Sequence, residues 1–235
     1  MFWSLFAPAL ILFGLTPPSL SAGSIVIGFV GGLVKRDDRA HAEVQFAQHL
    51  RNDYPSGVAV RVFQNRQGRQ ALEEVTRLLD SNRDGNLSTE EKLGGGISIY
   101  GHSWGASEAV TLARALGERG IPVLLTVQVD SVRKRGENDA TIPANVAEAV
   151  NFYQRDGLLH GLAEIHAADP SRTRILGNFR LDYKAAPVDS GGYPWYARIF
   201  MKPHIEIESD PRVWRQVELL IRSKLPAPAP VAQGR

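Results

Sequence analysis

Two patterns of apolar residues alternate along the first half of the chain. Short apolar runs rich in β-branched residues are typical of buried strands, and they cover residues 24–30, 58–64, 96–102 and 121–130. Between them, apolar residues recur at helical spacing over residues 39–54, 68–79 and 106–120. Strands and helices that alternate with short connections predict an α/β fold with a mainly parallel sheet flanked by helices.

The pattern becomes less regular beyond residue 130. Residues 142–154 predict a helix, with Pro143 suited to its first turn, and residues 173–183 predict another strand. The chain then closes with an amphipathic helix over residues 210–225. Its apolar face consists of Val213, Trp214, Val217, Leu220 and Ile221.

Both ends of the chain differ from the middle. The apolar run MFWSLFAPALILFGL is short for a membrane span, and small residues follow it. Residues 1–22 therefore predict a signal peptide and an exported protein, periplasmic or secreted. No Lys or Arg precedes the run, so the alternatives are an uncleaved N-terminal membrane anchor or a misassigned start, and membrane association is expected through this segment alone. Residues 226–235 predict a disordered tail, which leaves one domain over residues 23–225.

Composition narrows the classes of function. The 27 basic and 25 acidic residues give a net charge of +2, and no basic stripe is interleaved with aromatic residues. This distribution argues against nucleic acid as a partner. The sequence has no cysteine, which excludes disulfides, thiolate metal sites and a cysteine nucleophile.

A glycine-rich pentapeptide, GHSWG, connects the third predicted strand to the third predicted helix. Ser103 lies at its centre, with glycines two residues away on each side. The pentapeptide alone is common by chance, but its position between a strand and a helix is that of a nucleophile elbow. Ser103 is therefore the candidate nucleophile, and it needs a histidine as base and a carboxylate to orient that histidine.

Asp130 is the candidate acid because it ends the fourth predicted strand, at the carboxyl edge where parallel sheets place their chemistry. The alternative is an aspartate that caps a turn. His204 is the candidate base, because in elbow hydrolases the histidine follows the acid along the chain. The alternative is a surface histidine after a proline. Five histidines are set aside because they precede the elbow, adjoin Ser103 and point elsewhere, or fall in an irregular region: His41, His49, His102, His160 and His166.

Two backbone N–H groups normally bind the oxyanion that forms during acyl transfer. Trp104, the residue after the nucleophile, supplies the first by position. The stretch GFVGG after the first predicted strand is the source of the second, from Phe29 or Val30. The alternative is that these glycines simply make a tight turn.

These features together resemble the α/β-hydrolase-fold serine hydrolases, in particular small lipase- and esterase-like members. The resemblance covers residues 24–225 and rests on IGFVGG, GHSWGA, VQVDSV and KPHIEIE. IPANVAEAVNFYQ also resembles a helix that follows the acid in some of these proteins. Two departures are that the acid comes one strand earlier than in most of the fold, and that the sheet is short, as in a reduced version.

The resemblance implies hydrolysis of a small-molecule or lipid ester through an acyl-enzyme, with no cofactor for catalysis. Thioesterase and peptidase activity are alternatives, because a triad alone does not separate them. A third alternative is a non-catalytic binding protein, stabilised by calcium, on a hydrolase scaffold.

A separate motif, DSNRDGNLSTEE, spans residues 80–91 and matches the spacing of an EF-hand calcium loop. Gly85 stands at the sharp turn, and Leu87 stands where an apolar anchor is expected. The alternative is an ordinary polar turn. A calcium ion bound here is expected to be structural rather than catalytic. The candidate ligands are Asp80, Asn82, Asp84, Asn86, Ser88 and Glu91.

Overall fold

The computed structural model describes residues 23–189, 193, 195, 199 and 201–227. The predicted signal peptide, residues 1–22, and most of the predicted tail lie outside the described residues. None of the described helices combines the length and the apolar character needed to cross a bilayer.

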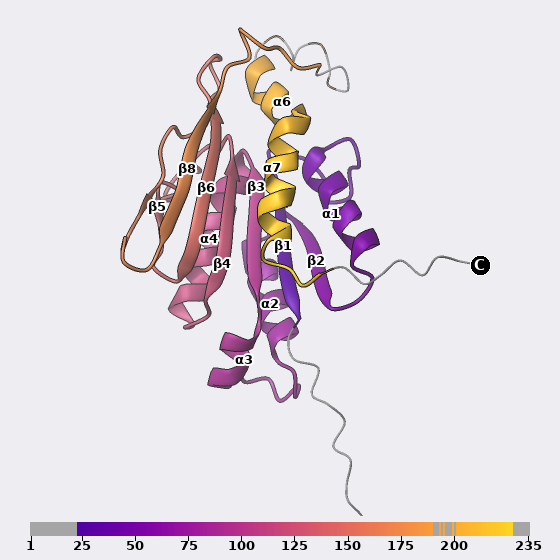
Figure 1. Cartoon of the computed structure of the whole chain (residues 1–235), viewed down its shortest axis with the longest axis vertical. Helices are drawn as coiled ribbons and strands as arrows, with labels where there is room; N and C mark the ends of the chain where they lie inside the picture. The colour runs from indigo at the N-terminus through magenta and orange to yellow at the C-terminus, as the bar shows by residue number, and fades with distance from the viewer. Residues whose placement is uncertain (1–22, 190–192, 194, 196–198, 200, 228–235) are drawn as a thin grey trace, which may run out of the picture.

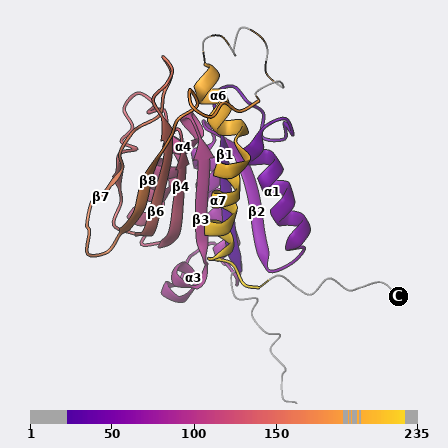
Figure 2. The same cartoon turned by 45° about the horizontal axis from the view of Figure 1, so that its top comes forward.

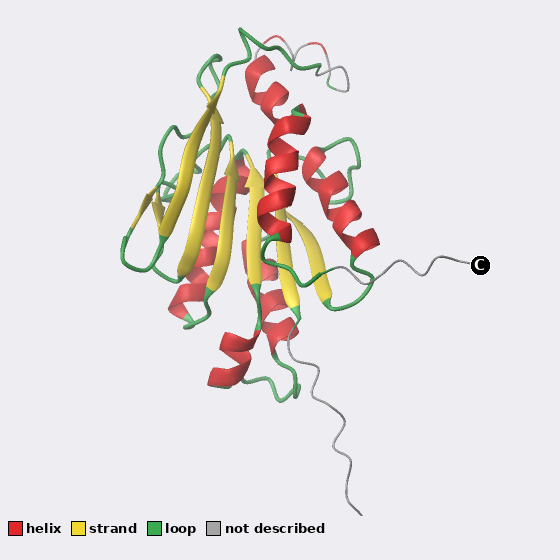
Figure 3. Ribbon diagram, in the orientation of Figure 1, coloured by secondary structure: helices red, strands yellow, loops and turns green. Residues whose placement is uncertain are grey.

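A six-stranded sheet forms the centre of the fold, and every neighbouring pair of strands in it is parallel. Figure 3 shows the sheet in yellow, with helices on both of its faces. In spatial order the strands are β2 (Val58–Gln64), β1 (Ser24–Val30), β3 (Ile97–His102), β4 (Val123–Val129), β6 (Val146–Gln154) and β8 (Arg174–Leu181). Two short strands, β5 (Thr141–Ile142) and β7 (His166–Ala167), form a separate parallel pair.

The helices cover the sheet in two layers, each closing one apolar core. One face carries α1 (Ala42–Asp53) and α7 (Pro211–Arg222), while the other carries α2 (Gly68–Leu79) and α4 (Trp104–Glu118) (Figure 1). The short helix α3 (Thr89–Gly94) follows the EF-hand-like loop. These layers confirm the predicted α/β architecture, a mainly parallel sheet flanked by helices with a strand–serine–helix turn at Ser103.

The predicted helix over residues 142–154 is wrong, because this segment contains β5 and β6 instead. Val146, Ala149 and Val150 fit helical spacing, yet all three are buried in a strand that pairs with β4 on one side and β8 on the other. A strand covered on both faces loses the polar–apolar alternation that would distinguish it from a helix. Its β-branched and aromatic residues were the better guide.

A short helix that was not predicted, α6 (Lys202–Ser209), lies near the carboxyl end of the sheet, next to the start of α7 (Figure 2). Asp210 joins the two helices and caps α7 by accepting the Arg212 N–H at 2.8 Å. Asp210 also accepts a hydrogen bond from the buried Tyr183 hydroxyl at 2.9 Å. The Trp214 indole N–H donates to the Glu208 carbonyl at 2.6 Å. These bonds hold α6 in place over the sheet.

Candidate active site

Ser103 stands in a strained turn between β3 and α4. Its φ of 58° and ψ of −127° lie outside the regions that a residue with a side chain normally adopts. The turn is also closely packed: a Cβ on Gly101 would overlap the backbone of Gly105, and a Cβ on Gly105 would overlap the Phe29 carbonyl. The two glycines of the pentapeptide therefore allow the close backbone approach that this turn requires.

Three segments bring the predicted nucleophile, base and acid together. His204, on α6, has its Nε2 2.9 Å from Ser103 Oγ and its Nδ1 2.6 Å from Asp130 Oδ2. All three side chains are buried. With its proton on Nδ1, the imidazole donates to Asp130 and presents an Nε2 lone pair to the hydroxyl. The arrangement can therefore take a proton from Ser103 while the carboxylate stabilises the resulting charge.

The Asp130 carboxylate is fixed by groups that the sequence did not single out. Oδ2 accepts the Gln154 side-chain N–H at 2.8 Å in addition to the His204 ring. Oδ1 accepts the backbone N–H groups of Gln154 at 3.1 Å and Gly161 at 2.8 Å. Four N–H groups thus surround the carboxylate, so its orientation toward His204 is set by both oxygens.

A cavity of about 350 Å³ opens beside Ser103 and His204. Its size is at the lower end of the range for small-molecule sites, about 300–1,000 Å³. Most of its lining is apolar, and the polar side chains that line it are His41, His102, Ser103, Tyr193, His204 and Glu208. The apolar side chains that line it are Leu33, Val34, Trp104, Val132, Leu159, Met201 and Ile205.

The predicted oxyanion donors lie at different positions relative to this cavity. Trp104 begins α4, where a backbone N–H has no partner within the helix. Phe29 and Val30 are buried in β1, which lies between β2 and β3, and neither lines the cavity. The next residues do: Gly31 and Gly32 line it, and a Cβ on Gly31 would lie 2.9 Å from the Ser103 Cβ.

His102, which was expected to point away, is buried with its ring centroid 4.6 Å from that of His204. Its Nδ1 lies 3.3 Å from Glu208 Oε2 and 3.5 Å from Glu43 Oε1. Burial lowers the pKa of His102 to about 4. A neutral imidazole therefore lies between the triad and two acidic side chains.

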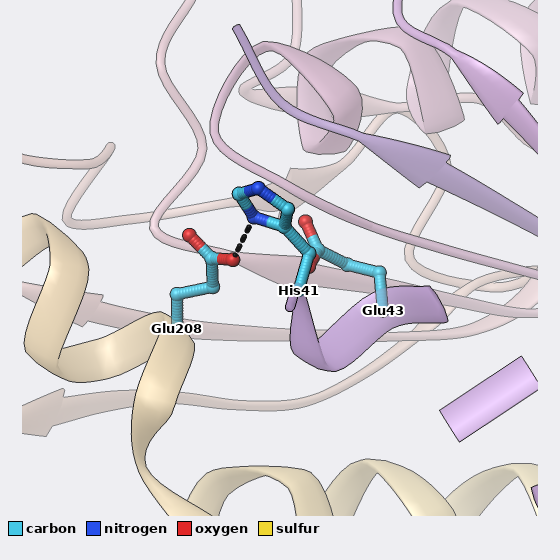
Figure 4. A group of neighbouring side chains, drawn as sticks. All are labelled: His41, Glu43 and Glu208. Atoms are coloured by element: carbon cyan, nitrogen blue, oxygen red, sulfur yellow. Dashed lines mark hydrogen bonds and ion pairs between the residues drawn. The ribbon is translucent and has the colours of Figure 1, made fainter. Parts of the chain in front are cut away.

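Those acidic side chains belong to a cluster that sequence reasoning missed: His41, Glu43 and Glu208. His41 Nδ1 lies 2.6 Å from Glu208 Oε1, and Figure 4 shows the side chains converging from the start of α1 and from α6. The Tyr193 hydroxyl donates to Glu208 and lies 3.0 Å from His41 Nδ1. Burial raises the pKa of Glu43. Burial acts to lower the pKa of His41, but the Glu208 hydrogen bond and nearby carboxylates raise it overall.

The EF-hand-like loop lies on the surface, between α2 and α3. Asp80 accepts the Gly85 N–H at 2.9 Å, and Asp84 accepts the Asn86 N–H at 2.7 Å. Glu91 forms a capping box with Ser88 at the start of α3 and also accepts N–H groups at the start of the loop. Within the described part of the chain, the carboxylates of this loop do not form a group of three or more acidic or histidine ligand atoms that lie within 4.8 Å of one another.

No protein-family model and no curated protein matches this sequence. Among solved structures, a cutinase-like protein from Cryptococcus sp. is 13% identical with a TM-score of 0.47, over 90% of this chain and 98% of that one. An acetyl xylan esterase is 11% identical with a TM-score of 0.42, over 87% and 99%. A protein of Xanthomonas campestris pv. campestris described as an alpha/beta superfamily hydrolase is 14% identical with a TM-score of 0.38, over 86% and 99%. At scores this low the likenesses carry no argument about activity.

Proposed function

We propose that the protein is a serine hydrolase that cleaves carboxylic esters. Ser103 attacks the ester carbonyl while His204 takes its proton, and Asp130 orients and stabilises the imidazolium. His204 then protonates the leaving alcohol, and a water molecule, activated by the same histidine, releases the acid from the acyl-enzyme. The observation that supports this proposal most is the hydrogen-bond chain from Ser103 through His204 to Asp130, at 2.9 and 2.6 Å.

The oxyanion of the tetrahedral intermediate needs donors close to Ser103. The Trp104 N–H, at the start of α4, is the first. The position of Phe29 and Val30 within β1 favours an N–H just beyond the strand as the second, at Gly31 or Gly32. Because these glycines border the cavity, and a Cβ on Gly31 would lie 2.9 Å from the Ser103 Cβ, a carbonyl bound at the serine would lie next to them.

The size and lining of the cavity indicate the class of acyl group. An apolar pocket of about 350 Å³ accommodates a short or medium acyl chain rather than a long one. We therefore expect small-molecule or short-chain lipid esters as substrates. Export, predicted from residues 1–22, is part of the proposal and would place these substrates outside the cytoplasm.

A fluorophosphonate probe tests the proposal directly, because it reacts only with an activated serine. The purified full-length protein is treated with the probe and its intact mass is measured, beside Ser103→Ala and His204→Ala. Ser107→Ala is the matched control, since Ser107 is also a buried serine of the elbow region but bonds Glu137 instead of His204. One adduct on the wild type and on the control, absent from both triad variants, is the expected result.

An unlabelled but folded wild type would contradict the serine hydrolase and favour a non-catalytic binding protein. If the probe labels Ser103, matched oxygen esters, thioesters and amides of one acyl chain then separate the esterase from a thioesterase or a peptidase. We expect the highest kcat/KM on oxygen esters, with a maximum at short or medium chain length.

We also propose a structural calcium ion in the loop of residues 80–91. Its donor set consists of carboxylate, amide, hydroxyl and carbonyl oxygens, which are the ligands that calcium prefers. The hydrogen bonds that orient Asp80, Asp84 and Glu91 use some of their lone pairs and leave others for a cation. Such an ion would tie α2 to α3 and so fix the connection that leads into β3.

A further inference from the structure

The cluster of His41, Glu43 and Glu208 is an arrangement that ester hydrolysis does not require. Each of these residues offers one ligand atom, and the three atoms lie within 4.8 Å of one another. Ligand atoms about 2.0–2.2 Å from a shared ion are at most about 4.4 Å apart, so small side-chain adjustments would bring them to one ion. We propose that His41, Glu43 and Glu208 bind one divalent transition-metal ion of the Zn²⁺ type.

Glu43 provides the observation that points to a ligand. Its carboxylate is fully buried, and neither oxygen has a hydrogen-bond partner of regular geometry among the described residues, although His102 Nδ1 lies 3.5 Å from Oε1. Burying a carboxylate without hydrogen bonds costs several kcal/mol, and proteins almost always avoid it. The carboxylate points into the cluster, toward His41 and Glu208 (Figure 4). A cation at the centre of the cluster would supply the missing partner.

The charge of the cluster agrees with a divalent ion. Two buried carboxylates, Glu43 and Glu208, each offer a ligand atom within reach of one ion, beside the imidazole of His41. A divalent cation balances both carboxylates and leaves the imidazole neutral, which is the form that ligates metal.

The donor types indicate which class of metal. One imidazole and two carboxylates form a mixed nitrogen and oxygen set, which suits Zn²⁺ and similar first-row ions, whereas Ca²⁺ and Mg²⁺ take oxygen ligands. Three protein ligands leave a coordination position open for water. The second imidazole nitrogen of His41, Nε2, lies 3.8 Å from Asp38 Oδ2, the kind of carboxylate that commonly orients a ligating histidine.

The site is also accessible. His41 and Glu208 line the same cavity as Ser103 and His204, so an ion can enter from the active-site side. The proposed ion would bridge α1 to α6, the helix that carries His204. Metal binding does not depend on the proposed hydrolysis: Ser103→Ala should bind Zn²⁺ like the wild type, so failure of one proposal leaves the other standing.

Zinc titration of the chelator-treated full-length protein tests the site. Calorimetry should find one Zn²⁺ per chain, and Zn²⁺ at about a hundred times its Kd should raise Tm by about 5–10 °C. Both effects should be lost in Glu43→Gln and His41→Ala. His49→Ala, which removes an exposed histidine from the same helix, should retain both. Ca²⁺ should not compete with Zn²⁺ for the site.

The change in Tm of Glu43→Gln without Zn²⁺ distinguishes a metal ligand from a merely structural glutamate. Without Zn²⁺, Glu43→Gln should melt no lower than the wild type, because it removes a buried carboxylate that lacks a donor. The proposal is overturned if Zn²⁺ does not bind, or if it raises Tm equally in wild type and Glu43→Gln. Either result would mean that these three residues do not form a metal site.

If Glu43→Gln and His41→Ala both fail to fold, Co²⁺ binding to the wild type still tests the metal site. Co²⁺ in a four- or five-coordinate site with one imidazole gives visible absorption bands, and Zn²⁺ should abolish them at one equivalent. Bands that behave in this way support the site, and their absence overturns it.

Discussion

The Asp130→Asn substitution tests the geometry of the triad more sharply than removal of the serine. Asparagine keeps the shape of aspartate but replaces one acceptor oxygen with an NH₂ group. On the Oδ1 side that group would face the backbone N–H groups of Gln154 and Gly161, which cannot become acceptors. The amide oxygen must therefore take this side. The NH₂ group is left to face His204 Nδ1, where Oδ2 was.

This orientation forces the wrong tautomer of His204. To accept from the new NH₂ group, Nδ1 must lose its proton, and the proton moves to Nε2, which faces Ser103 Oγ. An Nε2 that carries a proton cannot take one from the serine. The Gln154 side-chain NH₂, which donates to Oδ2 in the wild type, would also face the new NH₂ group. Gln154 cannot rotate its amide to present an oxygen there, because its Oε1 accepts the Asp156 N–H and its Nε2 donates to the Leu159 carbonyl.

We expect kcat to fall by about 10⁴, as the same exchange does in other serine triads, which corresponds to about 5–6 kcal/mol of transition-state stabilisation. The assay is the hydrolysis of a chromogenic short-chain ester, with thermal unfolding to verify the fold. Asp139→Asn is the matched control, because Asp139 is a buried aspartate that bonds Ser131 rather than the triad. An Asp130→Asn enzyme within about tenfold of wild type would refute Asp130 as the orienting acid.

Three further predictions follow from other parts of the structure. Gln154→Ala should lower kcat about ten- to hundredfold with KM little changed, since it removes a hydrogen bond to the Asp130 carboxylate. Gly105→Ala should destabilise the fold by about 1–3 kcal/mol in urea denaturation, whereas Gly94→Ala, whose Cβ meets nothing within 4 Å, should not. Ca²⁺ should raise the Tm of chelator-treated wild type and leave Glu91→Gln unchanged; equal responses would remove calcium from the loop.

The regular first half of the fold could be predicted because each strand and helix there has a clear period. That regularity also located two members of the candidate triad. His102 pairs with Val129 across β3 and β4, so the next residues, Ser103 and Asp130, leave the sheet side by side. Because neighbouring parallel strands end at the same edge of the sheet, the sequence alone predicts that residues directly after them lie close together.

The second half could not be predicted equally well, since its elements depend on partners distant in the chain. β6 is a strand because β4 and β8 flank it, and no local period shows this. The eight-residue α6 is too short to be stable alone, and it exists through contacts with α7 and β6. His204 was found from its order in the chain, but the helix that presents it was not.

The His41, Glu43 and Glu208 cluster was missed because His41 and Glu208 are 167 positions apart in the sequence. One signal was available. Glu43 stands on the buried stripe of α1 together with Phe46, Ala47 and Leu50, at the spacing of a helical face. A charged residue in such a stripe needs a buried partner. The residues that most deserve a search for a partner are therefore those that interrupt an apolar pattern, and not only those that match a motif.

The candidate triad and the cluster of His41, Glu43 and Glu208 both include a residue of α6. His204 and Glu208 are four residues apart, so they lie on the same face of this helix, one directed to the triad and the other to His41. A two-turn helix cannot fix its own position, so these contacts and the Asp210 junction determine where His204 lies relative to Ser103. Because the 2.9 Å bond to Ser103 depends on that position, we expect substitutions of Glu208 to change the geometry of the candidate base as well.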